Sequence, residues 1–139
     1  MDSFEFSPVA GPDKAYRLRL LWLVSTAGIA LLIGVLTLAP TVPMPPGELP
    51  FDKIAHALAF MALVIPTAAL WPRLTVWVGL AAVLYGGLIE VVQPYAGRTA
   101  EVADLLADGA GVVLGVILGM GFRLAFARRR ARRPVRHRR

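Results

Sequence analysis

The sequence predicts an all-α protein: an integral membrane four-helix bundle with both its N and C termini in the cytoplasm. Of its 139 residues, 57% are hydrophobic and only 17% are charged, which leaves too few polar side chains to cover a water-soluble domain of this size. The apolar residues form four long continuous runs, as membrane spans do. The basic residues cluster where an even number of spans would place them on one side.

Four apolar segments mark the expected spans. They cover residues 18–39, 54–71, 74–92 and 102–126. Each approaches the roughly 20 residues that a helix needs to cross about 30 Å of hydrocarbon. The first segment follows basic residues, as the core of a signal peptide does, but it is too long for one, so we expect an uncleaved anchor.

Arginine and lysine residues set the expected orientation. They precede the first span, occupy the turn between the second and third at Arg73, and crowd residues 128–139, which hold eight arginines and no acid. With four spans these regions share one side, and the positive-inside rule makes that side the cytoplasm. The sequence therefore predicts a multi-pass protein of the cytoplasmic membrane.

Two terminal segments should flank a membrane domain of residues 18–126. Residues 1–17 are predicted to be a disordered cytoplasmic segment, and residues 127–139 a disordered, arginine-rich cytoplasmic tail. Arginine runs can bind phosphate backbones. In a membrane protein, such a tail more often fixes the topology and contacts anionic lipid. We therefore expect membrane lipids as partners and no specific nucleic acid.

Most of the remaining polar residues near the span ends fall on the opposite, outer side. They are Asp52, Lys53 and His56 at the start of the second span, Glu90 and Gln93 at the end of the third, Arg98 in the following connection, and Glu101, Asp104 and Asp108 at the start of the fourth. On the third and fourth spans they share a face with small residues, so they should point into the bundle. Charge is tolerated there and usually marks function.

The small residues of the fourth span form a stripe of their own. Gly111, Gly115 and Gly119 continue the face of Asp104 and Asp108 at a four-residue spacing. Such spacing lets membrane helices approach closely. The stripe could serve the core of one chain or a contact between two copies, so a homo-oligomer is one possibility.

Not every acid in this set needs a functional explanation. Asp52 and Asp104 could be first-turn acids favoured by the helix dipole, and Glu101 is expected at the solvated interface. Glu90 lies near a helix C-terminus, where an anion is disfavoured, so a cation or a hydrogen-bond donor should compensate it. Asp108 lies beyond capping distance and also needs a partner. Arg98 is the expected partner of Glu90 or Asp104.

His56 is the residue best suited to chemistry in this set. With Asp52 or Glu90 it could form an acid–base pair, which makes His56, Glu90 and Asp104 the catalytic candidates. The same histidine with Glu90, Asp104 and Asp108 could hold a divalent metal such as Mg²⁺, Mn²⁺ or Ca²⁺. Neither a nucleophile elbow nor an HExxH motif occurs in the sequence.

Two stretches together resemble the VanZ-like family of small bacterial membrane proteins. They are FDKIAHALAFMALV and GGLIEVVQPYAGRTAEVADLLADGAGVVLG, and the resemblance covers roughly residues 20–122. The family pattern is Asp-Lys-x-x-His, Glu-x-x-Gln, a loop arginine, and Asp-x-x-x-Asn-x-x-Gly, in that order. The matching positions are Asp52, Lys53, His56, Glu90, Gln93, Arg98, Asp104 and Gly111. The chain departs from the pattern at Asp108, which stands in place of the usual asparagine.

The resemblance implies a bacterial cytoplasmic membrane protein of unsettled biochemical activity. The founding member of the family is associated with low-level resistance to teicoplanin, which acts on the cell wall outside the membrane. An outward-facing polar site on this chain would agree with a role on envelope lipids or wall precursors, and with an effect on glycopeptide susceptibility.

Three functions are compatible with the outer polar set. The first is binding of an outer-leaflet lipid or wall precursor; five acids against two bases favour an amine-bearing ligand or a divalent metal. The ligand-binding candidates are Asp52, Lys53, His56, Glu90, Gln93, Arg98, Asp104 and Asp108. The second is an intramembrane lipid hydrolase or transferase. A small transporter ranks last, because charge is confined to the outer third of the spans.

Overall fold

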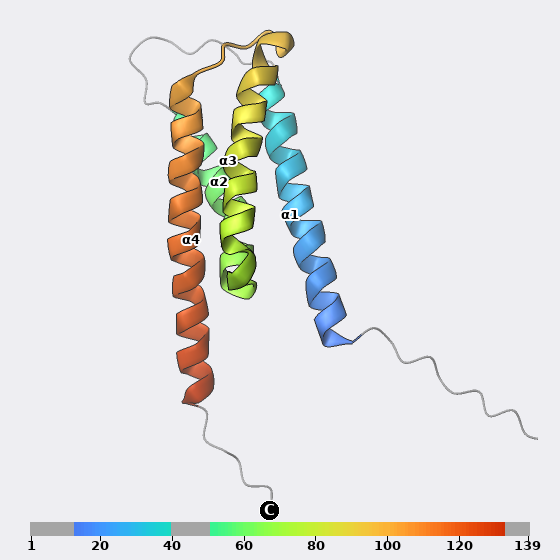
Figure 1. The fold of residues 1–139 in the computed structure, drawn as a ribbon, viewed down its shortest axis with the longest axis vertical. Coiled ribbons are helices and arrows are strands. Elements are labelled where there is room, and N and C mark those ends of the chain that lie inside the picture. The colour runs from blue at the N-terminus through green and yellow to red at the C-terminus, as the bar shows by residue number, and fades with distance from the viewer. Residues whose placement is uncertain (1–12, 40–50, 133–139) are drawn as a thin grey trace, which may run out of the picture.

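The computed structural model describes residues 13–39 and 51–132. Within them the chain is helical without a strand, which confirms the predicted all-α fold (Figure 1). The α-helices are α1 (Lys14–Leu38), α2 (Phe51–Leu70), α3 (Thr75–Val92) and α4 (Val102–Ala131), and two short 3₁₀ helices, η1 (Pro72–Leu74) and η2 (Gln93–Ala96), flank α3. Four helical segments are long and apolar enough to cross a membrane, as predicted.

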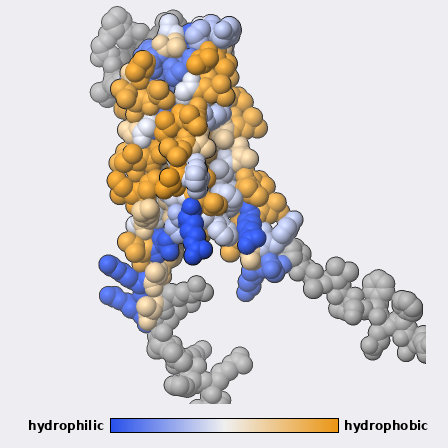
Figure 2. Space-filling view, in the orientation of Figure 1, coloured by the Kyte–Doolittle hydropathy of each residue, from blue (hydrophilic) through white to orange (hydrophobic). Residues whose placement is uncertain are grey.

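The helices run side by side along one axis. The start of α1 and the end of α4 lie at the same end of the bundle, and η2 lies at the opposite end (Figure 1). Apolar side chains form a broad belt around the middle, and hydrophilic side chains gather at both ends (Figure 2). Such a surface suits a protein whose middle faces hydrocarbon.

Both terminal helices are longer than the apolar runs that predicted them. α1 begins at Lys14 rather than residue 18, because the Asp13 side chain caps it by accepting a hydrogen bond from the backbone nitrogen of Tyr16 at 2.6 Å. α4 continues to Ala131, since arginine is a good helix former and is favoured at a helix C-terminus. The expectation of disorder was therefore wrong for residues 14–17 and 127–131. Residues 1–12 and 133–139 lie outside the described part.

The glycine stripe of α4 packs directly on the backbone of α2. A Cβ atom added to Gly115 would lie 2.6 Å from the carbonyl oxygen of Met61, and one added to Gly119 would lie 2.6 Å from the Cβ of Ala68. A Cβ on Gly111 would overlap the backbone of Ala57. The stripe therefore belongs to the core of one chain, where it brings α2 and α4 into close contact.

α1 packs more loosely than the other helices. Of its residues only Ile33 and Thr37 are buried. Side-chain hydrogen bonds tie it to α2 and α3: Trp22 Nε1 donates to Thr67 Oγ1 at 2.9 Å, and the Tyr85 hydroxyl donates to the carbonyl of Ala30 at 2.7 Å. The buried hydrophobic cluster consists of Ile33, Phe60, Leu63, Val64, Ala82, Ile89 and Val112. This arrangement leaves a pocket between α1 and α2.

Candidate functional site

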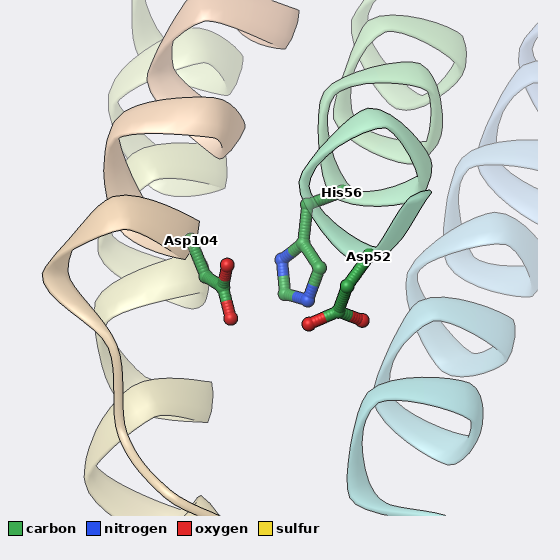
Figure 3. A group of neighbouring side chains, drawn as sticks. All are labelled: Asp52, His56 and Asp104. Carbon is green, nitrogen blue, oxygen red and sulfur yellow. The ribbon is translucent and has the colours of Figure 1, made fainter. Parts of the chain in front are cut away.

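The first turns of α2 and α4 face each other. Asp52 and His56 lie four residues apart and so share one face of α2, while Asp104 lies in the first turn of α4. Figure 3 shows the imidazole of His56 between the two carboxylates. Each of the three side chains offers a ligand atom, and these atoms lie within 4.8 Å of one another.

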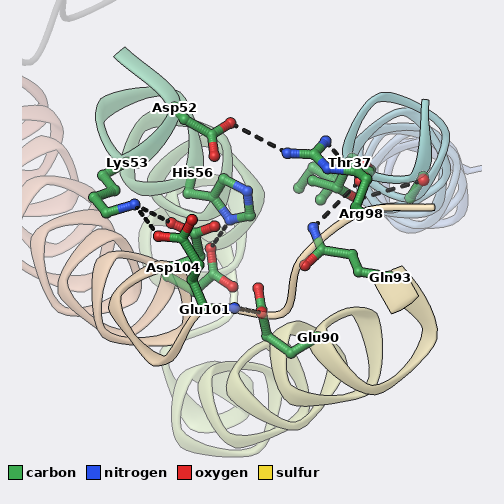
Figure 4. A network of polar contacts seen from close by, with 12 residues as sticks. Thr37, Asp52, Lys53, His56, Glu90, Gln93, Arg98, Glu101 and Asp104 are labelled. Carbon is green, nitrogen blue, oxygen red and sulfur yellow. Dashed lines mark hydrogen bonds and ion pairs between the residues drawn. The ribbon is translucent and has the colours of Figure 1, made fainter. Parts of the chain in front are cut away.

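Seven of the predicted site residues are labelled in Figure 4, at the end of the bundle where η2 is found, and the eighth, Asp108, contacts His56 there. We call them, with Glu101, the polar cluster. Its members are Asp52, Lys53 and His56 from α2, Glu90 from α3, Gln93 from η2, Arg98 and Glu101 from the connection before α4, and Asp104 and Asp108 from α4. The side chains interact in separate groups, and several of their partners differ from those expected.

His56 pairs with Asp108, and not with Asp52 or Glu90 as the sequence suggested. Its Nδ1 lies 2.9 Å from Oδ1 of Asp108, with both side chains almost fully buried. A carboxylate can only accept, so the histidine Nδ1–H donates. The close approach of α2 and α4 explains the pairing, because the contact of Gly111 with Ala57 sets residues 56 and 108 at the same level.

Gly86 of α3 makes room for the carboxylate of Asp108. A Cβ atom added to Gly86 would lie 3.2 Å from the Asp108 carboxyl carbon and closer still to one of its oxygens. Asp108 was predicted to need a partner, and that partner is His56. The backbone of Gly86 packs against the other side of the carboxylate. Any larger residue at position 86 would displace the acid.

Lys53 forms ion pairs with both acids at the start of α4. Its Nζ lies 2.7 Å from Oε2 of Glu101 and 3.1 Å from Oδ1 of Asp104. Asp104 is a first-turn acid, as expected, but it is also buried, with 2% of its surface exposed. Glu101 is exposed at the surface, also as expected. The lysine therefore joins a buried carboxylate to an exposed one.

Glu90 is compensated by a backbone donor. Its Oε2 accepts a hydrogen bond from the backbone nitrogen of Glu101 at 2.7 Å, which confirms that a donor offsets this anion at the end of α3. The bond satisfies a nitrogen just before the first residue of α4, Val102, where negative charge is favourable. The main chain of Glu101 thus takes part in the cluster, a role that its position in the sequence did not indicate.

Arg98 does not pair with Glu90 or Asp104, so that prediction was wrong. Its Nη1 donates to the carbonyl of Thr37 at 2.8 Å, and its Nη2 lies 3.5 Å from Oδ1 of Asp52. The cause lies in the backbone: Gly97 has a φ of 75°, a left-handed conformation that ends η2 and redirects the chain. The carbonyls of the last turn of α1 lack helical partners, and the guanidinium supplies one.

Thr37 is a second main-chain contact that sequence reasoning missed. Its carbonyl accepts from Arg98 and also from Nε2 of Gln93 at 3.3 Å. A main-chain carbonyl is present in every residue type, so no side-chain pattern could have pointed to this position. Through it, two residues of the polar cluster hold the end of α1.

Four buried side-chain atoms of the cluster have no hydrogen-bond partner within the described part of the chain. They are Nε2 of His56, Oε1 of Glu90, Oε1 of Gln93 and Oδ2 of Asp108. Buried polar atoms are nearly always hydrogen-bonded, since leaving one unpaired costs free energy. The cluster therefore has bonding capacity beyond its internal contacts.

A pocket of about 290 Å³ lies between α1 and α2 and reaches the polar cluster. Apolar side chains line most of it, among them Ile29, Leu32, Ile33, Leu36, Ala59, Phe60 and Ala62. Asp52, His56 and Arg98 also line it. The pocket is thus apolar along its walls and carries both signs of charge.

The set of residues suited to a metal differs from the predicted one. Within the described residues, the group whose ligand atoms all lie within 4.8 Å of one another consists of Asp52, His56 and Asp104. Glu90 and Asp108, two of the expected ligands, bond instead to the backbone of Glu101 and to Nδ1 of the histidine.

A comparison with protein-family models gives a match to the family described as VanZ/LLP1 over residues 9–124. The matched range contains every member of the polar cluster. Neither the search of curated proteins nor the search of solved structures gave a match.

Proposed function

Because this chain belongs to the VanZ/LLP1 family, as its motifs predicted, and carries four helices able to span a membrane, we propose that it binds an envelope lipid or a lipid-linked wall precursor. The polar group of the ligand lies at Asp52, His56 and Arg98, and its hydrocarbon lies between α1 and α2. The protein is a multi-pass protein of the bacterial cytoplasmic membrane in this proposal.

The observation that carries the proposal is that the pocket has an apolar part and a charged part. Its walls are aliphatic and aromatic, whereas Asp52 and Arg98 supply an acceptor and a donor. A purely polar ligand would gain little free energy from contact with the apolar walls. A hydrocarbon would form no hydrogen bond or ion pair with the charged side chains. An amphiphile whose headgroup carries an amine and a phosphate matches both parts, with the amine toward Asp52 and the phosphate toward Arg98.

The distribution of basic residues supports an outward-facing site. Lys14, Arg17 and Arg19 belong to the first turns of α1, and Arg128 and Arg129 to the last turns of α4. These two helix ends lie at the same end of the bundle, opposite η2 and the polar cluster (Figure 1). With the basic end in the cytoplasm, the cluster faces the outer leaflet, where wall precursors and glycopeptides are found.

A test is to fill the pocket without touching the polar cluster. Ala62 lines the pocket, and Ala110 is an exposed alanine on α4 outside it. The full-length protein in mild detergent, mixed with phosphatidylethanolamine, should retain one lipid per chain by native mass spectrometry. Ala62→Phe should abolish retention, and the matched control Ala110→Phe should preserve it. Equal retention by both variants would overturn the proposal.

An intramembrane hydrolase is the second candidate, favoured by the pairing of His56 with Asp108. The acid fixes the ring through Nδ1 and leaves Nε2 to accept the proton of an attacking water, as a general base does. Purified protein would then release the headgroup from labelled lipid, and His56→Gln would stop the release. Retention of intact lipid over hours by the unaltered protein would exclude this candidate.

A further inference from the structure

Two helices bring three potential metal ligands to one point. Asp52 and His56 come from adjacent turns of one face of α2, and the packing of α4 on α2 places Asp104 opposite them. Their ligand atoms lie within 4.8 Å of one another (Figure 3). A cation with bonds of about 2.0–2.2 Å would fit between them after small rotations of the carboxylates.

The histidine supplies a second, independent observation. His56 is only 3% exposed, yet its Nε2 has no hydrogen-bond partner among the described residues. This nitrogen lies on the side of the ring that faces Asp52 (Figure 3). When the ring is neutral and its Nδ1–H donates to Asp108, Nε2 carries the free lone pair. Metal-binding histidines typically have this arrangement, in which a carboxylate holds the other ring nitrogen.

We propose that Asp52, His56 and Asp104 form a binding site for a divalent transition-metal cation such as Zn²⁺ or Mn²⁺. One imidazole nitrogen and two carboxylate oxygens suit these ions better than Ca²⁺ or Mg²⁺, which prefer oxygen ligands alone. Asp108 acts as a positioning residue that orients the ring. The site shares Asp52 and His56 with the pocket proposed above for a lipid, and its test contains no lipid, so that either proposal can fail alone.

The charges around the site favour a cation. The polar cluster holds five acids against two bases. Lys53 contacts one oxygen of Asp104, and Arg98 lies 3.5 Å from one oxygen of Asp52. Each carboxylate therefore has a second oxygen to offer. A divalent cation would reduce the remaining excess of negative charge beside His56 and Asp104, which are both buried.

The experiment measures metal bound to the full-length protein in detergent, with no lipid added. The protein is stripped with a chelator, dialysed against Zn²⁺ or Mn²⁺, and analysed for bound metal. One cation per chain is expected, and His56→Gln and Asp104→Asn should each weaken binding at least about tenfold. Asp13→Asn and His137→Gln are the matched controls, since they make the same changes elsewhere in the chain, and both should bind as the unaltered protein does.

A spectroscopic readout covers the case in which a variant does not fold. Bound Mn²⁺ next to an imidazole shows coupling to nitrogen in pulsed electron paramagnetic resonance. The unaltered protein should show this coupling, and monodisperse Asp52→Asn should bind Mn²⁺ more weakly. Failure of the well-folded protein to bind a stoichiometric cation, or bound Mn²⁺ without nitrogen coupling, would overturn the site and leave the lipid proposal untouched.

Discussion

His56 Nδ1 and Asp108 Oδ1 lie 2.9 Å apart, and both side chains are buried. The family pattern that the sequence resembles has asparagine at position 108, and its side-chain oxygen can accept the same hydrogen bond. Asp108→Asn should therefore change the free energy of unfolding by less than about 1.5 kcal/mol. Asp108→Ala leaves a buried donor unpaired and should cost about 1–3 kcal/mol.

Thermal unfolding of the two variants in the same detergent checks this prediction. An equal, large loss for both variants would mean that the charge of Asp108, and not its hydrogen bond, supports the fold.

The glycine stripe predicts that alanine substitutions at different positions of α4 change the stability of the protein by very different amounts. Gly115→Ala places a methyl group against the carbonyl of Met61 and should destabilise the protein by about 1–3 kcal/mol. Gly109→Ala meets open space and should be neutral, or up to about 1 kcal/mol stabilising through helix propensity. Denaturation of both variants in mixed micelles measures the difference. Similar effects at the two positions would contradict the packing described for α2 and α4.

Arg98 should hold the end of α1 in place. Arg98→Gln removes the charge-assisted hydrogen bond to Thr37, which is worth about 1.5–3 kcal/mol. Backbone amides in the last turns of α1 should then exchange with deuterium at least about tenfold faster. Exposed Arg73→Gln serves as the control and should leave these amides unchanged. Unchanged exchange in Arg98→Gln would show that other contacts hold α1.

The orientation of the bundle is open to a simple labelling test, because the chain has no cysteine. Thr99→Cys places a thiol in the connection before α4, and Arg73→Cys places one in η1, near the basic end of the bundle. In whole cells, an impermeant thiol reagent should label the first variant and not the second. The opposite result would place the polar cluster in the cytoplasm and remove the proposed access to wall precursors.

The role of the polar cluster can be tested by measuring the antibiotic sensitivity of cells. Glu90→Gln and Asp104→Asn each remove a buried charge, and both should alter sensitivity to envelope-directed antibiotics. Asp13→Asn, at the other end of the bundle, should not. The measurement compares inhibitory concentrations at equal expression in the membrane. Unchanged sensitivity for both cluster variants would contradict a role of the cluster in the envelope.

The sequence was sufficient to predict the helices, because apolar runs of this length rarely form anything other than membrane-spanning helices. It also placed the eight candidate residues at one end of the bundle, since alternating spans bring their outer ends together. The pairings could not be read in the same way. The partners of His56 and Arg98 depend on how far α2 slides along α4 and on the turn at Gly97, which are properties of the packed backbone.

The main-chain contacts and the pocket could not be predicted from side-chain patterns. The carbonyl of Thr37 and the backbone nitrogen of Glu101 act through main-chain atoms. The pocket between α1 and α2 exists because α1 packs loosely, which depends on contacts and not on composition.

The most direct test of lipid binding is to map where a lipid touches the protein. Phosphatidylethanolamine with a photoreactive group on its acyl chain is added to the full-length protein, and crosslinked peptides are identified by mass spectrometry. The account predicts crosslinks concentrated at Ile29, Leu32 and Ala62, which disappear in competition with unlabelled lipid. Crosslinks spread evenly over the exposed apolar faces of α3 and α4, for example at Trp77 and Leu114, would contradict it.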